Sequence, residues 1–418
     1  MKIDTIKAAT LALRGFMPNT QTTNWTFSLE RMQQFMADLG DPQEKLKIIH
    51  VAGTSGKTST SYYIADMLRQ AGHKVGLTVS PHVDTVNERI QLNGQPLPEA
   101  DFCRLLGDFI ELPAVKKANP SYFGLLIAFA FWVFAQEGVD YAVIEVGLGG
   151  RLDSTNVISR PDKVCVIADI GFDHMGMLGN DLAMIASEKA GIIQPGNQVI
   201  MAQQGDVVMG VINSRVDLVK AKLEVLKPSG APAHLPLFQQ RNWFVARAAV
   251  DFVAKRDGFA FSQDNAVASA AILIPARMEV VEYHGKTVIL DGAHNAQKIT
   301  ALCESITEKY PDQKLAAVVS FVHDKDESMN KKMTALHSIL DHLIITTFHA
   351  EQDVPKWSID PDIIERAARM VGFNSVEVID KPLDAFAALL KRPEPVVLVT
   401  GSFYLLQKHI RPLVKGEL

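Results

Sequence analysis

Apolar and polar positions alternate along the chain in a way that separates short β-rich runs from longer amphipathic stretches. From about Lys47 onward, runs rich in Val and Ile are followed by stretches whose apolar residues recur at helical spacing. The first such stretch places Tyr63, Ile64 and Met67 on one side, and Gly72 is suited to end the helix. This alternation predicts a mostly parallel sheet with helices on both faces. Strands are predicted at 47–52, 74–79, 141–146 and 163–170, with a helix running through Ala71 after the first strand.

The alternation starts again after Pro275 and predicts a second α/β domain. We therefore divide the chain into residues 1–274 and residues 275–418, and expect 197–237, which Gly and Pro interrupt, to be an irregular excursion. The apolar run 125–135 is shorter than the ~20 residues that span a bilayer and predicts a buried helix. The second domain has predicted strands at 286–290, 314–320, 342–347, 375–379 and 395–400 and predicted helices at 296–310, 330–340, 360–370 and 383–391.

Composition and charge narrow the functional classes. The 418 residues include 42 Lys and Arg against 47 Asp and Glu, a net charge of −5, so no global positive field attracts nucleic acid or an anionic membrane. Cys103, Cys165 and Cys303 lie too far apart for a disulfide framework or a paired-cysteine metal site. The first residues lack an apolar core followed by a cleavage site. We therefore expect a cytoplasmic protein in a reducing compartment, with no nucleic-acid or membrane partner.

A Gly-rich turn follows the first predicted strand and carries the sharpest chemical signal. In such a turn, backbone N–H groups and a helix N-terminus point at a phosphate chain, a lysine adds positive charge, and a hydroxyl can reach Mg²⁺. The spacing G-x-x-G-K-T is shorter than the full Walker pattern, and the alternative is a tight turn with a surface lysine. The flanking strand and helix favour an N-terminal P-loop-type, mostly parallel domain. The second alternation of strands and helices, after Pro275, predicts a C-terminal Rossmann-like α/β domain. The candidate nucleotide-binding residues are Gly53, Thr54, Ser55, Gly56, Lys57, Thr58 and Ser59.

Polar residues stand at the ends of three further predicted strands. A charged residue in an apolar strand is costly unless it is paired or metal-bound, so Glu145 is a candidate Mg²⁺ ligand, with an edge-strand surface glutamate as the alternative. Ser80 follows the strand 74–79. Asp173 and His174 follow the strand 163–170, and they fit metal or phosphate contact as well as a structural role. Because ligands bind at the carboxyl ends of strands in open α/β sheets, these residues predict one cleft.

Four more charged or polar residues stand at positions suited to a site. Lys189 falls late in a predicted helix, where a lysine ordinarily complements the helix dipole. Asp291 and His294 follow the strand 286–290, and Asp291 could accept hydrogen bonds from ribose hydroxyls. Arg277 lies near the domain boundary, from where it could swing between the domains. The local pattern leaves a functional and a structural role open for each residue of the second domain.

Taken in order, these segments resemble those of the folylpolyglutamate synthase/dihydrofolate synthase family, a branch of the Mur-type ATP-dependent ligases. The resemblance runs from about Phe27 to Leu406 and implies an ATP-binding Mur-ligase-type domain at 1–274 and a glutamate-ligase domain at 275–418. So many ordered matches are far more specific than any one of them. The matching segments include I-H-V-A-G-T-S-G-K at 49–57 and D-G-A-H-N at 291–295, and the others are 80–82, 88–90, 93–94, 145–156, 173–174, 188–192, 239–242, 275–279, 323–326 and 400–404.

The resemblance implies an ATP- and Mg²⁺-dependent ligase that adds L-glutamate to a folate. Such an enzyme phosphorylates the acceptor carboxylate with ATP, and the glutamate amine then displaces phosphate through a tetrahedral intermediate. The resemblance also implies a monomer in which Lys57 contacts the β- and γ-phosphates and Lys189 becomes carbamylated. It implies Mg²⁺ positions at Thr58, Ser80, Glu145 and His174. It implies that Asn242, Arg277 and Asp291 contact the nucleotide from the far side of the cleft, with Arg277 near the γ-phosphate, and that His294 and Ser402 contact the glutamate. The catalytic residues that it implies are Lys57, Lys189, Arg277 and His294.

The sequence departs from the family's usual pattern at several positions. Ser55 and Thr58 replace the Asn and the second Gly of the usual T-G-T-N-G-K-G-S turn, Phe123-Gly124 stands where Phe-Glu is usual, and 197–237 is shortened. These differences touch the acceptor side more than the ATP side. Two alternatives therefore stay open: a Mur-type ligase that acts on a non-folate carboxylate, such as a cell-wall precursor, and a non-catalytic nucleotide-binding regulator. For a folate ligase, dihydropteroate and reduced folate both fit as acceptors.

Overall fold

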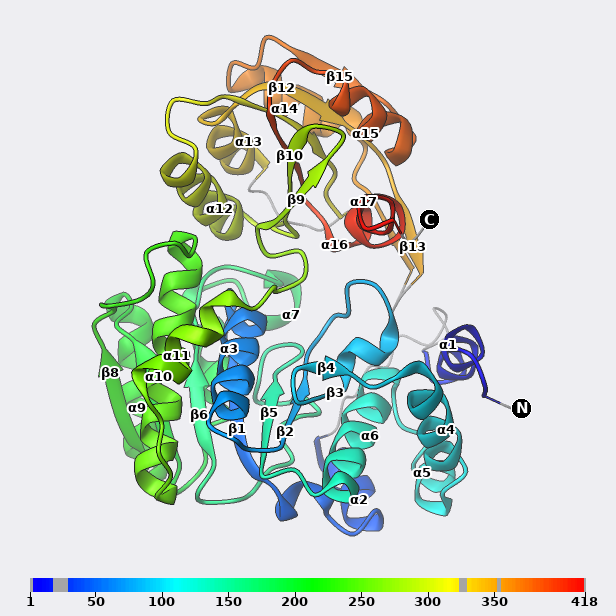
Figure 1. Cartoon of the computed structure of the whole chain (residues 1–418). Helices are drawn as coiled ribbons and strands as arrows, with labels where there is room; N and C mark the ends of the chain where they lie inside the picture. The colour runs from blue at the N-terminus through cyan, green and yellow to red at the C-terminus, as the bar shows by residue number, and fades with distance from the viewer. Residues whose placement is uncertain (1–2, 18–28, 323–328, 352–354, 417–418) are drawn as a thin grey trace. The chain divides into compact units, whose positions relative to one another are not determined.

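The structure, a computed structural model, describes residues 3–17, 29–322, 329–351 and 355–416 (Figure 1). Phe27 and the segment 323–326, which contribute to the resemblance, lie outside these residues. The chain divides into two compact units, and each is described by itself. The boundary expected between residues 274 and 275 stays a prediction. The first unit comprises 1–173, 177–232 and 239–272, and the second comprises 174–176, 233–238 and 273–418.

Over its described residues, the first unit is built on an eight-stranded sheet in the order β4-β3-β2-β5-β1-β6-β7-β8. The strands β2, β5, β1, β6, β7 and β8 run parallel, and only the short β3 and β4 at one edge are antiparallel. Along β5 every residue is buried, so both faces of the sheet are covered. The predicted mostly parallel sheet is confirmed. The strands are β1 (Lys47–Ala52), β2 (Val75–Thr78), β3 (Gln91–Leu92), β4 (Gln95–Pro96), β5 (Tyr141–Glu145), β6 (Val164–Ile167), β7 (Gln198–Ala202) and β8 (Lys222–Leu226).

The apolar run 125–135 lies in α6 (Tyr122–Glu137), which is the buried helix that the sequence predicts. Ser121 caps α6 by accepting the N–H of Gly124, and Gly138 ends it with a φ of +59°. In the part of the chain that the structure describes, no helix has the length and hydropathy needed to cross a membrane. The other α-helices before residue 273 are α1 (Ile6–Arg14), α2 (Leu29–Asp38), α3 (Lys57–Gln70), α4 (Glu99–Ile110), α5 (Pro113–Ala118), α7 (Met175–Leu178), α8 (Leu182–Ala190), α9 (Asp206–Val219), α10 (Leu237–Asp257) and α11 (Gln263–Ala268).

The expectation of an irregular excursion at 197–237 is wrong for most of its length. Residues 198–226 form β7, α9 and β8, which extend the parallel sheet. Helix α9 buries Val208, Ile212 and Val216, spaced one turn apart, in the core that also contains β7 and α8. The strand β8 lies at the edge of the sheet and is largely exposed, so its residues are mixed in polarity and give a weak strand signal.

The second unit is a separate α/β layer structure. Its sheet has the order β15-β12-β11-β16-β10-β9 over the described residues, parallel except for β9, which pairs antiparallel with β10. The predicted alternation of strands and helices is confirmed, and β9 and the hairpin β13–β14 are additional. The elements are β9 (Glu279–Tyr283), β10 (Lys286–Leu290), α12 (Ala296–Lys309), β11 (Leu315–Val319), α13 (Met329–His337), β12 (Leu340–Ile345), β13 (His349–Glu351), β14 (Pro355–Trp357), α14 (Pro361–Met370), β15 (Val376–Val378), α15 (Pro382–Leu390), β16 (Val396–Thr400), α16 (Phe403–Leu405) and α17 (Arg411–Val414).

Candidate active site

The loop from Gly53 to Gly56 joins β1 to α3 and has the backbone geometry of a phosphate-binding turn. Gly56 has a φ of +84°, a conformation that favours glycine. The N–H groups of Thr54 and Ser55 donate to the carbonyl oxygen of Asp169 at 2.7 and 3.0 Å, which ties the loop to the chain that follows β6. The N-cap of α3 is Gly56, so the N–H groups in the first turn of this helix donate no hydrogen bond to a capping side chain. A helix N-terminus of this kind, at the end of a glycine loop, suits a chain of phosphates.

Glu145 ends β5 and connects two other predicted metal residues. Its side chain is buried, and Oε1 accepts from the hydroxyl of Thr58 at 2.8 Å while Oε2 accepts from the N–H of Ser80 at 3.1 Å. The strand β5 lies between β2 and β1, so the alternative of an edge-strand surface glutamate is wrong. The structure therefore brings Thr58, Ser80 and Glu145 together at the carboxyl ends of neighbouring parallel strands, where ligands bind in open α/β sheets.

The atoms around Glu145 fit Mg²⁺. The carboxylate of Glu145 and the hydroxyl of Thr58 offer oxygen, the ligand that Mg²⁺ prefers, and the backbone of Ser80 lies against the same carboxylate. Within the described ranges, no group of three or more His, Cys, Asp or Glu side chains could hold an ion by itself. Mg²⁺ commonly takes several of its ligands from phosphate and water. His174 groups with the second unit and has a left-handed φ of +49°, and its role stays a prediction.

Two lysines reach the same atom of the loop. Lys57, the first residue of α3, donates from Nζ to the carbonyl oxygen of Gly53 at 3.1 Å. Lys189, in the last turn of α8, donates to the same oxygen at 3.0 Å. A lysine that only complements a helix dipole stays in water, whereas the side chain of Lys189 is 3% exposed. The burial of Lys189 and its hydrogen bond to Gly53 therefore place its side chain at the Gly53–Gly56 loop.

Close packing between two of the matching segments fixes the end of α8. A Cβ added to Gly150 would lie 2.6 Å from the carbonyl oxygen of Glu188, and one added to Gly191 would clash with Arg151. The guanidinium of Arg151 also pairs with the Glu188 carboxylate at 2.7 Å. These glycines permit the backbone contact that holds the last turn of α8, and with it Lys189, against the loop after β5.

Helix α10 brings two more polar side chains to the Gly53–Gly56 loop and the chain that follows β6. A Cβ added to Gly56 would clash with the amide of Asn242, so Asn242 lies beside the loop and in the same unit, whereas we expected it on the far side of the cleft. Arg241 pairs with Asp169 at 2.6 Å. Burial raises the pKa of Asp169, and the positive charge of Arg241 opposes the shift. Sequence analysis missed Asp169 because a single acid after a strand gives no sign that a distant helix supplies its partner.

In the second unit, three predicted site residues gather around the ring of Phe403. The guanidinium of Arg277 lies over the ring, with Cζ 4.2 Å from the ring centroid. His294 meets the ring edge-on, with the ring centroids 6.0 Å apart. Ser402 precedes Phe403 in the chain and accepts the N–H of Tyr404 at 3.1 Å. Arg277, His294 and Ser402 therefore form one local group, and their roles stay predictions.

Asp291 follows β10 and shapes the chain around it. Its Oδ2 accepts from the N–H of Met278 at 2.6 Å, and its Oδ1 accepts from the N–H of Ala293 at 2.7 Å. Burial raises the pKa of Asp291 to about 6, and Arg277 and these hydrogen bonds oppose the shift. A carboxylate oxygen can accept more than one hydrogen bond, so the predicted contact with ribose hydroxyls stays compatible with this geometry.

His294 has a partner at each ring nitrogen. Nδ1 lies 2.8 Å from the carbonyl oxygen of Gly292, and Nε2 lies 3.1 Å from Nζ of Lys298, one turn along in α12. Because a carbonyl oxygen can only accept, Nδ1 carries the proton and Nε2 accepts from the Lys298 ammonium group. Sequence analysis missed Lys298. Its spacing of four residues from His294 at the start of a helix was the available signal.

Comparisons with known proteins identify the family. Residues 276–403 match the model of the Mur ligase, glutamate ligase domain. A dihydrofolate synthase/folylpolyglutamate synthase from Bacillus subtilis (strain 168) is 32% identical over 411 residues, which cover 90% of this chain and 92% of the relative. The chain belongs to the folylpolyglutamate synthase/dihydrofolate synthase family. A dihydrofolate synthetase from Saccharomyces cerevisiae is 29% identical and covers 92% of this chain and 97% of its own length.

Solved structures of folylpolyglutamate synthase/dihydrofolate synthase proteins share the fold. The Mycobacterium tuberculosis folylpolyglutamate synthase complexed with ADP has a TM-score of 0.85 and 27% identity, and the alignment covers 99% of both chains. The Escherichia coli FolC in complex with DHPP and ADP has a TM-score of 0.82 and 25% identity, and covers 99% of this chain and 98% of its own. The predicted family and fold class are therefore confirmed.

Gly124, which departs from the usual pattern of the folylpolyglutamate synthase/dihydrofolate synthase family, lies in the first turn of α6. A Cβ there would lie 3.2 Å from Oγ of Ser121, 3.4 Å from Sδ of Met32 and 3.6 Å from Oγ of Ser154. A longer side chain would require some of these neighbours to move. Gly124 thus lies close to the side chains of Ser121, Met32 and Ser154.

Proposed function

We propose that this ATP-dependent ligase couples the conversion of ATP to ADP and phosphate to amide formation between L-glutamate and the carboxyl group of a folate. The observation that carries the proposal is the cluster of Thr58, Ser80 and Glu145 beside the Gly53–Gly56 loop. The glutamate ligase domain model over residues 276–403 supports the amino-acid substrate. The names of the relatives, and the FolC complex with DHPP and ADP, support a folate-type acceptor.

In the first step, an oxygen of the acceptor carboxylate attacks the γ-phosphorus of ATP. The bond between that phosphorus and the β–γ bridging oxygen breaks, and ADP leaves an acyl phosphate behind. The N–H groups at the start of α3 and the ammonium group of Lys57 hold the phosphates and offset their charge. Mg²⁺, when held by Thr58, Ser80, Glu145 and His174, would further neutralise the phosphate oxygens.

In the second step, the glutamate nitrogen attacks the acyl carbon. The tetrahedral intermediate collapses, phosphate leaves with the bonding electrons, and the nitrogen loses a proton to become the amide. His294 and Ser402 orient the glutamate, Arg277 offsets charge on the transferred phosphoryl group, and Asp291 and Asn242 hold the nucleoside. The neutral ring of His294, with Nδ1 protonated, presents a fixed tautomer at this place.

We also propose that Lys189 carries a carbamate. Its Nζ and that of Lys57 donate to one carbonyl oxygen, so two positive charges share a confined place. Addition of CO₂ to the neutral amine, with loss of one proton, replaces one of these cations with an anion, which relieves the repulsion and adds oxygen ligands near Mg²⁺. A ¹³C resonance of a carbamate after incubation with ¹³C-bicarbonate, absent in Lys189→Met, tests this proposal; equal spectra for both proteins would exclude it.

A second candidate keeps the chemistry and changes the acceptor. Gly124 supports it, because the chain lacks the usual carboxylate at this place in the first turn of α6. Mass spectrometry of products separates the two candidates when the enzyme receives ATP, Mg²⁺ and L-glutamate with dihydropteroate, tetrahydrofolate or a UDP-muramoyl precursor. We expect a product in which glutamate has been added to a pterin. A product formed only from the muramoyl precursor would establish the second candidate.

We further propose that the enzyme is a cytoplasmic monomer. Cys103, Cys165 and Cys303 are buried free thiols, which is consistent with a reducing compartment. Light scattering on the purified protein tests the monomer, and a mass near twice that of the chain would exclude it.

A further inference from the structure

Arg277 sits in an unusual backbone segment. The residues on both sides of it, Ala276 and Met278, have φ values of +54° and +51°, which non-glycine residues rarely adopt. Each such residue costs free energy and persists only where the surrounding structure holds it. The backbone on both sides of Arg277 is therefore held in place by contacts from elsewhere in the second unit.

Two buried carboxylates supply those contacts. The N–H of Ala276 donates to Oε2 of Glu279 at 2.9 Å, and the N–H of Met278 donates to Oδ2 of Asp291 at 2.6 Å. Both left-handed residues are thus anchored through their N–H groups. The backbone of Arg277, which lies between them, is therefore held on both sides.

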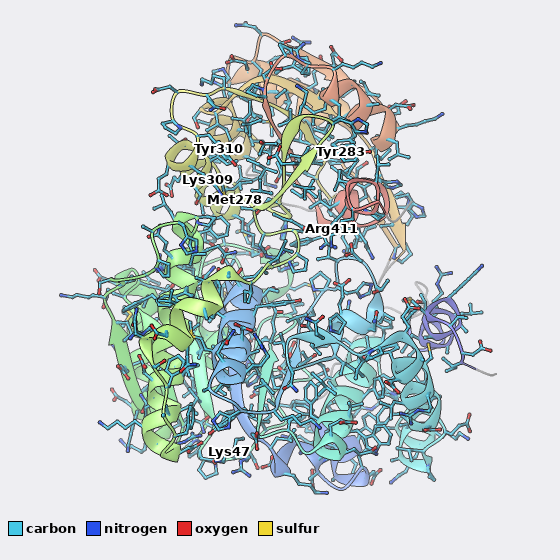
Figure 2. The ribbon with its side chains drawn as sticks, viewed as in Figure 1. Lys47, Met278, Tyr283, Lys309, Tyr310 and Arg411 are labelled. Atoms are coloured by element: carbon cyan, nitrogen blue, oxygen red, sulfur yellow. The ribbon has the colours of Figure 1, made fainter. Side chains whose placement is uncertain are left out.

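The C-terminal helix fixes the first of these carboxylates. Arg411, at the start of α17, donates from Nε to Oε2 of Glu279 at 2.7 Å and from Nη2 to Oε1 at 3.2 Å, and both side chains are buried. Lys415, one turn later, lies 3.9 Å from Oε1 of the same carboxylate. Figure 2 labels Arg411 on the C-terminal helix and Met278 in the segment that this helix supports. A paired guanidinium sets both the place and the plane of the carboxylate.

We propose that Arg411 is a positioning residue for Arg277. It fixes Glu279, Glu279 holds the N–H of Ala276, and the neighbouring guanidinium of Arg277 is thereby aimed across the ring of Phe403. Phe403 belongs to the same C-terminal stretch as Arg411, so this stretch sets both the backbone and the stacking surface of Arg277. The inference rests on the proposed role of Arg277 near the transferred phosphoryl group and extends it to a residue that touches no substrate.

The variant Arg411→Lys tests the inference. Lysine keeps the positive charge but offers a single point charge in place of the fork that contacts both carboxylate oxygens. Since a misplacement of about 1 Å can lower turnover on the order of 10²-fold, we expect kcat to fall roughly 10- to 100-fold, with the KM for glutamate unchanged. Arg369→Lys is the matched control, because Arg369 forms an exposed ion pair with Glu365 on α14 of the same unit.

A double-mutant cycle separates positioning from a loss of stability. In an Arg277→Ala background, Arg411→Lys should lower kcat no further, although its effect on the melting temperature should remain. Independent, multiplied losses would overturn the inference. A core variant, Ile364→Val, adjusted by temperature to the same fraction folded, shows how much loss reduced stability alone produces.

Two further outcomes are decisive. The cycle is measured with whichever acceptor supports phosphate release, so its result does not depend on a folate being the acceptor. An unchanged kcat in Arg277→Ala would overturn both the role of Arg277 and the inference. If Arg411→Lys does not fold, Arg411→Met combined with Glu279→Gln leaves no unpaired buried charge and serves in its place. Wild-type kcat in that folded variant would show that Arg277 works without the Arg411–Glu279 pair, and it would overturn the inference.

Discussion

Replacing Lys57 with alanine should lower turnover on the order of 10²–10³-fold and leave the fold intact. Lys57 is the first residue of α3, and its Nζ donates to the carbonyl oxygen of Gly53 at 3.1 Å. In the proposed mechanism this charge offsets the charge of the phosphates, whereas in the folded chain Lys57 contributes the hydrogen bond to Gly53. Activity and stability should therefore respond very differently to the same substitution.

The structure sets the size of both effects. Loss of the hydrogen bond to Gly53 costs about 0.5–1.5 kcal/mol. A cation at the N-terminus of a helix opposes the helix dipole, so its removal from α3 returns about 0.3–1 kcal/mol. The two terms largely cancel, and the free energy of unfolding should change by less than about 1 kcal/mol, which is ~2–4 °C in melting temperature for a unit of this size. Removal of a group that stabilises developing charge lowers kcat on the order of 10²–10³-fold.

The assay compares phosphate release and thermal unfolding of Lys57→Ala, wild type and Lys255→Ala, which removes an exposed lysine in α10 of the same unit. We expect Lys255→Ala to match wild type in both measurements. Unaltered phosphate release in Lys57→Ala would refute the assignment of the loop. A melting temperature lowered by more than ~10 °C would instead refute the claim that the lysine contributes little to the fold.

Three further predictions address the other parts of the site. Gly56→Ala should weaken ADP binding, measured by calorimetry, because alanine at a φ of +84° is strained and its Cβ clashes with Asn242; unchanged affinity would remove Asn242 from the site. His294→Ala should raise the KM for glutamate and leave the KM for ATP unchanged in steady-state kinetics, and an unaltered glutamate dependence would contradict its role. Burial raises the pKa of Asp291 from 3.8 to about 6. Protonation below pH 6 should therefore weaken ADP binding in wild type more than in Asp291→Asn. Parallel pH profiles of ADP affinity for the two proteins would contradict a contact between Asp291 and the nucleotide. The same shift favours the protonated folded state, so the contribution of Asp291 to the free energy of unfolding should fall as pH rises from about 4 to about 6.

Much of the fold could be predicted from the sequence because its central strands are continuous apolar runs with helices between them. The strands β1 and β10 have the predicted bounds, 47–52 and 286–290. The sequence pattern did not predict β8, because an exposed edge strand need not be apolar, or the antiparallel β9, whose burial is only partial. Strand signals are therefore strongest where a strand is buried on both faces.

The site could be predicted only as far as strand ends and glycine turns reveal it. Glu145 and Ser80 were found because polar residues at the ends of parallel strands meet at one edge of a sheet. The partners of Asp169 and Glu279 could not be predicted, because tertiary packing brings Arg241 and Arg411 to them. Arg411 is 132 residues from Glu279 in the chain. Sequence spacing carries no information about such contacts.

The most direct test of a folate ligase is to measure phosphate release from ATP in the presence of Mg²⁺. The assay is run with and without L-glutamate, and with and without dihydropteroate or tetrahydrofolate. We expect sustained release only when glutamate and a pterin are both present, because the acyl phosphate forms on the carboxylate of the pterin and the glutamate amine then displaces phosphate. The acceptor that supports release also identifies the step that the enzyme serves. Release that needs glutamate but no pterin, or no release with either pterin, would contradict the assignment of a folate ligase.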